Sequence, residues 1–345
     1  MKSYRIRIEP LSSFASPLHS DTLFGSLCWI YARRGQGEVK ALLELYDQGS
    51  PPFLVSNAFP EDLLPLPLSL FHYPHGLARS HAKQLKKLRY VPPDVFHAIR
   101  RLQPLDRLAD QLLDKPLPSI VSTTTAHNTI SRLTGTTGEE GSLYEVEEFF
   151  PAKPDRDGQL HPTYFSVYLY IEEGWENDVR DLFEHLAVIG FGGDRSTGKG
   201  AFRVQGGLEP IVFDTPHDVA QNPPGATTGE NLASQGYDAF VTLSNFCPAR
   251  SDPTEGLWRS FVKYGRLGDK FAVSGRPFKR PLIMFEPGSI FKASHGASSA
   301  IGNEPPHGLF GRLVKEIAPQ YPDVVQYAFA FPLPARFPIQ TNGGI

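Results

Sequence analysis

The stretch that decides the fold is GFGGDRSTGKGAF, at residues 190–202. Its five glycines surround Arg195 and Lys199. They predict a loop whose backbone amides can converge on an anion, because glycine permits positive φ and carries no Cβ. The apolar residues of 177–189 recur with helical spacing, and residues 201–204 have the composition of a strand. The loop is therefore expected to join the C-terminus of a helix to a strand.

Part of this loop, residues 193–199, matches most of the phosphate-binding loop of nucleotide hydrolases. Two observations argue against that function. The next residue is Gly200, where the motif has a Ser or Thr that binds Mg²⁺. The order is also reversed, because a phosphate-binding loop follows a strand and leads into the helix N-terminus that holds the phosphate. The remaining alternatives are an anion-binding loop of another kind and a glycine-rich connection without a ligand.

Outward from the loop, the first half of the chain has the pattern of one βαββαβ unit. Apolar and charged residues alternate over 4–9, which predicts a strand. Residues 21–33 have the apolar spacing of a helix, with Ser20 as its N-cap. A second strand is predicted at 163–172. Residues from about 50 to about 160 exceed what such a unit needs. The sequence therefore predicts an α+β fold with an insertion at about 50–160.

Three further motifs, taken with the glycine loop, resemble a known family. In chain order they are LHSDTLFG at 18–25, AHNTISR at 126–132 before Leu143 and Tyr144, and the late pair GRLG at 265–268 and FEPGSIF at 285–291. The glycine loop resembles the signature of the RAMP superfamily of CRISPR RNA-binding proteins, which follows the second helix of a ferredoxin-like domain. The combination resembles the fourth subunits of type III-A (Csm) effector complexes.

This resemblance implies two ferredoxin-like domains. The first would span 1–206, with the insertion and the glycine loop at 190–200. Residues 207–237, rich in Pro, Gly, Asn and Thr, read as a linker. A degraded second domain would then occupy 238–345, with strands at 237–246, 280–285 and 324–332 and a short helix at 309–317.

The resemblance also implies a non-catalytic subunit that holds the 5′ tag of the crRNA. Its expected partners are the large polymerase/cyclase subunit and the backbone RAMP subunit, with no cofactor, no metal and no membrane. The residues expected to contact RNA are His19, Ser20, Asn128, Arg132, Gly190, Phe191, Gly192, Gly193, Asp194, Arg195, Ser196, Thr197, Gly198, Lys199, Gly200 and Arg266. Two alternatives remain open: a metal-independent repeat-processing endoribonuclease with His19 as base, and the equivalent subunit of the type III-B (Cmr) complex.

Basic residues concentrate in two segments, although the whole chain carries a net charge of −3. Residues 79–107 hold eight basic and two acidic side chains, with Tyr90 and Phe96 available for stacking. Such a segment can follow a phosphate backbone or be a solvated helical face. Residues 259–280 hold seven basic side chains against one acidic side chain, interleaved with aromatic residues. The candidates for RNA contact in the first segment are Lys83, Lys86, Lys87 and Arg89.

Cysteine content and hydropathy bear on the compartment. The two cysteines, Cys28 and Cys247, lie far apart and form no C-x-x-C pair, which is typical of a reducing compartment and of a chain without structural zinc. No apolar run is long enough to cross a membrane, and the N-terminus leads into a strand rather than a signal sequence. We therefore expect a soluble, cytoplasmic protein.

Overall fold

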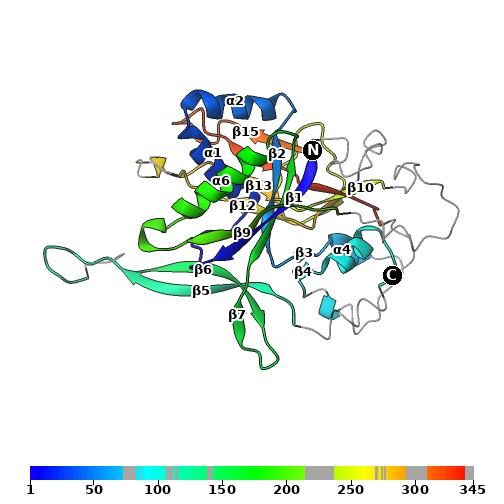
Figure 1. The fold of residues 1–345 in the computed structure, drawn as a ribbon, viewed down its shortest axis with the longest axis horizontal. Coiled ribbons are helices and arrows are strands. Elements are labelled where there is room, and N and C mark those ends of the chain that lie inside the picture. Colours follow the sequence, from blue (N-terminus) through cyan, green and yellow to red (C-terminus); the bar gives the residue numbers. More distant parts are fainter. Residues whose placement is uncertain are drawn as a thin grey trace.

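Two four-stranded antiparallel sheets form the centre of the computed structural model (Figure 1). The structure describes residues 1–72, 83–85, 87–105, 112, 116–137, 143–213, 237–268, 271–272, 275, 277–292 and 309–338. With 22% helix and 36% strand, the fold is α+β, as the sequence predicts. No helix among these residues has the length and hydropathy needed to cross a membrane.

The first sheet has the order β2-β8-β1-β9. Its strands are β1 (Lys2–Pro10), β2 (Phe53–Pro60), β8 (Phe165–Ile171) and β9 (Phe202–Pro210). Helices α1 (Ser20–Ala32) and α6 (Glu176–Ile189) follow β1 and β8 in the chain and lie against each other beside the sheet (Figure 1). Helix α2 (Gln36–Asp47) follows α1. With α2 and the segment between β2 and β8 set aside, the elements follow the predicted βαββαβ order: β1, α1, β2, β8, α6, β9.

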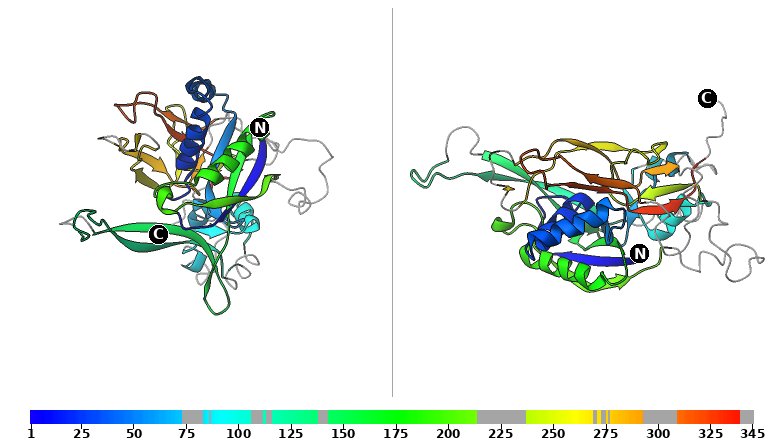
Figure 2. Two further views of the ribbon diagram at one scale, coloured as in Figure 1. Left: turned by 60° about the vertical axis from the view of Figure 1, so that its left-hand side comes forward. Right: turned by 90° about the horizontal axis from the view of Figure 1, so that it is seen from above.

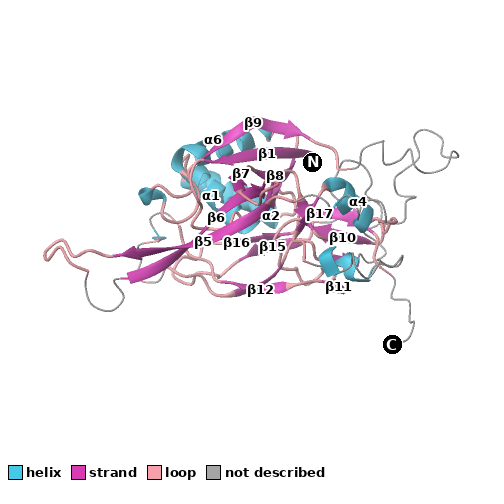
Figure 3. Ribbon diagram, turned by 90° about the horizontal axis from the view of Figure 1, so that it is seen from below, coloured by secondary structure: helices cyan, strands magenta, loops and turns pink. Residues whose placement is uncertain are grey.

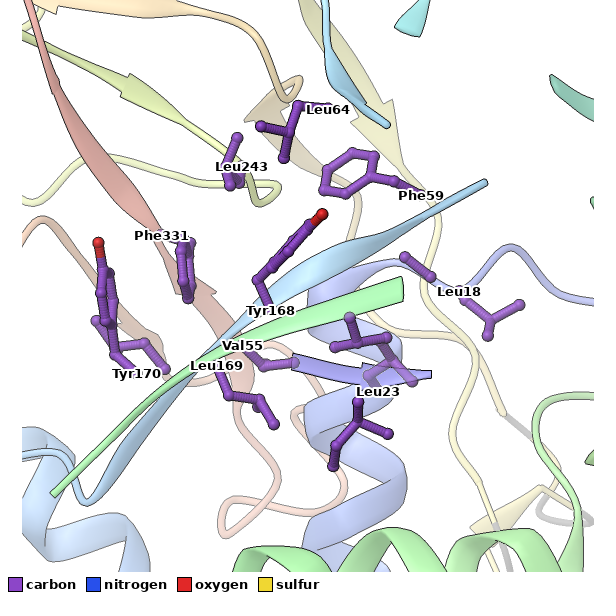
Figure 4. Packing of buried hydrophobic residues seen from close by; sticks show 14 of the residues in the cluster. Leu18, Leu23, Val55, Phe59, Leu64, Tyr168, Leu169, Tyr170, Leu243 and Phe331 are labelled. Carbon is purple, nitrogen blue, oxygen red and sulfur yellow. The ribbon is translucent and has the colours of Figure 1, made fainter. Parts of the chain in front are cut away.

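Strands β2 and β8 are buried at every position because both faces of the first sheet are covered. Val55 and Leu169 point toward α1, while Tyr168 and Tyr170 point toward the second sheet (Figure 4). The Tyr170 ring stacks on Phe331 at 4.2 Å between centroids. This two-sided burial explains why the sequence of β8 is apolar or aromatic at nearly every position rather than alternating.

The second sheet has the order β11-β14-β10-β17, and two separate two-strand ribbons lie beside it. The sheet strands are β10 (Ala239–Thr242), β11 (Gly256–Leu257), β14 (Ile290–Lys292) and β17 (Pro332–Ala335). The ribbons pair β12 (Ser260–Lys263) with β13 (Leu282–Phe285), and β15 (Gly311–Val314) with β16 (Gln326–Phe329). No described residue from 237 onward belongs to an α-helix.

The helix predicted at 309–317 is wrong, because residues 311–314 form β15. Gly311 and Leu313 are buried while Arg312 is exposed, which is the period of a strand. At Gly311, φ is +93°, and a Cβ would overlap the carbonyl of Ala328 on the partner strand. The apolar spacing of this short segment fits both periods, and close pairing with β16 selects the strand.

The chain leaves the first sheet between β2 and β8, at residues 61–164. Since β2 belongs to the sheet, the insertion begins after residue 60 rather than near 50. Its short elements are β3 (Leu64–Pro65), the 3₁₀ turn η1 (Leu68–His72), β4 (Tyr90–Val91) and α4 (Pro93–Arg100). Its long elements are β5 (Ser119–Asn128) and β6 (Leu143–Pro154), with β7 (Leu160–Pro162) beside β6. The β5–β6 hairpin projects well beyond the body (Figures 2 and 3).

Two predicted boundaries shift. Helix α1 begins at Ser20, so His19 is its N-cap residue. Strand β9 continues to Pro210, so the predicted linker does not start at 207. The rest of that linker, residues 214–236, lies outside the described residues.

Candidate nucleic-acid interface

The connection between β1 and α1, residues 11–19, holds the glycine loop in place. The amide of Gly200 donates to the Ser13 carbonyl at 2.8 Å, and the amide of Gly193 donates to the Ser16 hydroxyl at 3.2 Å. Phe191 is fully buried, with its ring edge-on to Phe14 at 6.1 Å. Phe191 therefore anchors the loop in the core, and residues 193–198 form its exposed surface.

The glycines of the loop meet different requirements. Gly200 has φ of +69°, and a Cβ there would overlap the Phe191 carbonyl. At Gly192, with φ of +83°, a Cβ would lie 2.9 Å from Ser16 Cβ. Gly198 needs glycine only for its φ of +88°, because no atom lies within 4 Å of its Cβ position. Gly193 has an ordinary φ and ordinary contacts, so the backbone does not require glycine at this position.

Most amides of the loop donate hydrogen bonds inside the protein. Those of Thr197 and Lys199 donate to the Asp194 carbonyl, at 3.0 and 3.2 Å, around the 3₁₀ turn η2 (Arg195–Thr197). The amides of 190, 191, 193, 198 and 200 are also used. Within the glycine loop, which the structure describes in full, the amides without a hydrogen-bond acceptor are those of residue 192 and of residues 194–196. An anion would have to bind through these.

The two cations of the loop differ in their surroundings. Lys199 Nζ lies 2.7 Å from the Glu148 carboxylate on β6 and 3.3 Å from the Ser13 hydroxyl. Glu148 is buried, and hydrogen bonds from Lys199 and Ser13 lower its pKa. Lys199 thus ties the loop to the hairpin. Arg195 is exposed and forms no ion pair with any described residue, so it is the loop cation available to a ligand.

A buried ion pair lies at the N-terminus of α1. Asp21, whose side chain is 1% exposed, lies 3.0 Å from Lys263 Nζ on β12. Asp21 also accepts hydrogen bonds from Asn245 at 3.3 Å and from Gln326 at 2.6 Å. Burial alone would raise the pKa of Asp21, but Lys263 and the other donors hold it below its usual range. The first helix is thereby fixed to the second half of the chain.

His19 belongs to the same network. Lys263 Nζ lies 3.3 Å from His19 Nδ1, and the imidazole meets the Phe261 ring edge-on at 6.1 Å. Burial and the Lys263 charge lower the pKa of His19 to about 4. The imidazole is therefore neutral and a weak base at neutral pH, which argues against His19 as the general base of a ribonuclease.

Ser20 is fully buried beside this network. Its amide donates to the Asn57 side chain at 2.9 Å, and its hydroxyl accepts from the Asn245 amide at 3.2 Å. Burial leaves Ser20 and Phe191 no surface for a ligand. Both support the site from inside.

The remaining candidates are spread over the surface. Asn128 and Arg132 are exposed on the β5–β6 hairpin, whose far end lies away from the body (Figure 1). Arg266 is exposed just after β12. The structure thus brings the glycine loop and residues 11–19 together, but not all of the motifs.

The basic segment at 79–107 is not one continuous solvated face. Lys83, Lys87 and Arg89 are exposed, whereas Lys86 lies outside the described residues. Arg100 is fully buried, and its guanidinium donates to the Pro334 carbonyl at 2.6 Å. Phe96 is also fully buried and not available for stacking, and Tyr90 packs against Phe59. Three of these groups therefore serve the core.

No group of three or more His, Cys, Asp or Glu side chains among the described residues is arranged to hold a metal ion. Cys28 lies among core residues, and burial raises the pKa of its thiol to about 12.

Comparison with known proteins gives a result only at the level of structure. No family model matches the chain, and no curated protein matches it in sequence. A chain in the crystal structure of a Csm1-Csm4 cassette in complex with cA4 matches with a TM-score of 0.58 at 20% identity, covering 98% of this chain and 99% of that one. The chain resembles Csm4 of type III-A complexes.

Two further structures agree. A Csm1-Csm4 cassette in complex with pppApA gives a TM-score of 0.56 at 21% identity, over 97% of this chain and 99% of that one. A chain of the Csm3-Csm4 subcomplex in the type III-A CRISPR-Cas interference complex matches with a TM-score of 0.54 at 14% identity, covering 97% of this chain and 99% of that one. At these identities the likeness to Csm4 is one of fold. The resemblance predicted from the sequence motifs is confirmed at that level.

Two contacts of the site escaped sequence reasoning. Lys199 was expected to contact RNA, yet it pairs with Glu148 on β6. Lys263 was one of many basic residues in its segment, and among the described ones it is the residue that forms an ion pair with Asp21. Neither pairing has a local signal, because the partners are 51 and 242 residues apart.

Proposed function

We propose that this chain is the crRNA 5′-tag-binding subunit of a type III-A CRISPR effector complex. The observation that carries the proposal is the exposed glycine-loop surface at 193–198, held by residues 11–19 in a chain whose fold is that of Csm4 over nearly its whole length. Arg195 and the available amides would hold phosphate oxygens of the tag, since backbone amides and arginine are common partners of phosphate.

The proposal includes the fold family of the first half. A βαββαβ unit whose four antiparallel strands have the order β2-β8-β1-β9 supports a ferredoxin-like RAMP domain over 1–206. We propose a degraded second domain over 238–345, joined to the first by a linker that ends near 237. The RNA would be single-stranded where it meets the loop, because unstacked bases expose edges and faces that a duplex hides.

The remaining contact candidates are His19, Asn128, Arg132 and Arg266. His19, as a neutral and half-buried imidazole, can hydrogen-bond or stack but is poorly suited to remove a proton. The subunit is therefore proposed to be non-catalytic and to need no cofactor. Exposed Lys83, Lys87 and Arg89 are proposed as further phosphate contacts, without Arg100 and Arg101, which are buried.

Partner choice follows from the named assemblies of the similar structures. Two of them pair Csm4 with Csm1, and a third pairs it with Csm3. We propose that this chain likewise docks to a large polymerase/cyclase subunit and to a backbone subunit, in the cytoplasm.

The experiment that tests this function is purification of the tagged chain from its host, with sequencing of co-eluting RNA and mass spectrometry of co-eluting proteins. Recovery of crRNAs sharing one 5′ tag, together with the two partner subunits, supports the proposal. Recovery of neither contradicts it. Arg195→Gln should lower the RNA yield, whereas Lys40→Gln, an exposed charge on α2, serves as the matched control.

A further inference from the structure

The ribbon formed by β12 and β13 has two faces of opposite character. Its inner face is fixed to the body: Phe261 and Met284 pack in the interior, and Lys263 pairs with Asp21. Lys279, three residues before β13, donates from its Nζ to the Gln326 side chain at 2.8 Å. These anchors hold the ribbon rigidly, so its outer face is a preformed surface.

The outer face alternates with the inner one along both strands. On β12, Val262 is 46% exposed, and Tyr264, just after the strand, is 75% exposed. On β13, Ile283, which pairs with Val262, is 64% exposed. Pairing continues past the ends of β12 and β13, where Arg266 bridges Phe278, which is 66% exposed. Arg280 is exposed in the segment that leads into β13, two residues after Phe278.

The charges on this face have one sign. Arg266 and Arg280 form no ion pair with any residue that the structure describes, and residues 258–268 and 277–285 contain no acidic side chain. Exposed aromatic rings interleaved with unpaired guanidinium groups are the surface that single-stranded nucleic acid requires, with rings for bases and cations for phosphates. An isolated large apolar patch without this charge would instead favour a protein partner.

The inner face of the same ribbon contacts the residues that hold the glycine loop. Lys263 reaches from the ribbon to His19 at 3.3 Å and to Thr22 at 3.2 Å. The same β1–α1 connection supplies Ser13 and Ser16, which hold the glycine loop. Residues 11–22 therefore contact both the glycine loop and the inner face of the ribbon.

We infer that the outer face of the β12–β13 ribbon is a second contact surface for single-stranded RNA. Unstacked bases would stack on Tyr264 and Phe278, and Arg266 and Arg280 would hold the flanking phosphates. The inference rests on the proposed function, since the RNA is the strand that the glycine loop holds. It adds a base-stacking platform to a site that otherwise contacts phosphates.

The test uses the full chain and two probes: a fluorescently labelled single-stranded RNA of mixed sequence, and the same backbone with abasic riboses. Tyr264→Ala and Phe278→Ala should each weaken binding of the normal strand by about 5- to 150-fold, the range for one stacked base. Neither should change binding of the abasic strand, because no base is left to stack. Phe278→Leu, which keeps apolar area without an aromatic ring, should behave like Phe278→Ala.

The arginines should act differently. Arg266→Gln and Arg280→Gln should weaken binding of both strands, and each should make the negative slope of log K against log salt shallower by roughly 0.7. Lys40→Gln is the charge control. All four positions on the ribbon are exposed, and matching melting temperatures would show that the variants are folded.

The outcomes separate this inference from the proposed function. If ribbon variants bind both strands like the wild type while Arg195→Gln still loses affinity, the second surface is refuted and the glycine-loop function stands. That result would assign the ribbon face to a protein partner. If the wild type binds neither strand, both proposals are refuted. A loss confined to the normal strand for the aromatic variants supports the inference.

Discussion

Replacement of Lys263 by Met removes the one cation that forms an ion pair with buried Asp21 among the residues that the structure describes. The carboxylate side chain is 1% exposed, and it would keep only Asn245 and Gln326 as neutral donors. Breaking a buried ion pair at one partner costs about 3–5 kcal/mol, because an uncompensated charge remains. Lys263 is itself 17% exposed, so we expect a value near the lower end, about 3 kcal/mol.

The assay is urea unfolding followed by fluorescence, with the free energy extrapolated to water. Lys315→Met is the matched control, because it breaks a surface pair with Asp47 at 2.7 Å, with side chains 59% and 39% exposed. The free energy of unfolding of this control should fall by less than about 1 kcal/mol. The double variant Asp21→Asn with Lys263→Met should recover part of the loss, since no buried charge is left unpaired.

The effect has a definite sign with pH. In the wild type the pKa of Asp21 is lowered, so its contribution is present above the unfolded pKa and is lost as pH falls through the folded value. In the Lys263→Met variant burial dominates and raises that pKa. The loss of unfolding free energy in the variant, relative to the wild type, should then be largest near neutral pH and should become smaller as the pH falls. A loss below about 1 kcal/mol at neutral pH, or one independent of pH, would refute this reasoning.

Three further outcomes are expected. Gly200→Ala should destabilise the chain by about 1–3 kcal/mol in thermal unfolding, because a Cβ overlaps the Phe191 carbonyl at positive φ, whereas Gly193→Ala should have little effect. Burial lowers the pKa of Lys279 to about 8, so the unfolded state binds more protons above that pH; stability should gain a rising component between pH 8 and about 10, and Lys279→Met should abolish it. Wild-type protein should leave repeat RNA intact in EDTA, and metal-independent cleavage lost in His19→Ala would contradict a non-catalytic subunit.

Local patterns predicted the first half of the fold well. The helix before the glycine loop and strand β1 have clear periodicities because each has one buried face, and β8 and β9 were predicted from their strand-like composition. The second half was harder. Its strands are two to four residues long, too short to distinguish a strand from a helical turn, and the segment at 309–317 shows the consequence.

In the candidate site, too, local features could be predicted from the sequence and tertiary contacts could not. Glycines and exposed cations of the loop could be found from the sequence, since their spacing is local. The partners of Lys199 and Lys263 could not, because tertiary pairing decides which lysines are free. The net charge counted along 79–107 overstates the exposed charge for the same reason, because Arg100 and Arg101 are buried. Sequence reasoning located the loop, and the structure shows that Arg195 is its available cation.

The most direct test of the central claim is the affinity of the purified chain for single-stranded RNA that carries the crRNA 5′ tag of its host, measured by fluorescence anisotropy. The account predicts that wild type and Lys40→Gln bind alike, and that Arg195→Gln binds about 10-fold more weakly or worse, the loss expected for one charge-assisted contact. Equal affinity of Arg195→Gln and wild type, or no binding by the wild type, would contradict it.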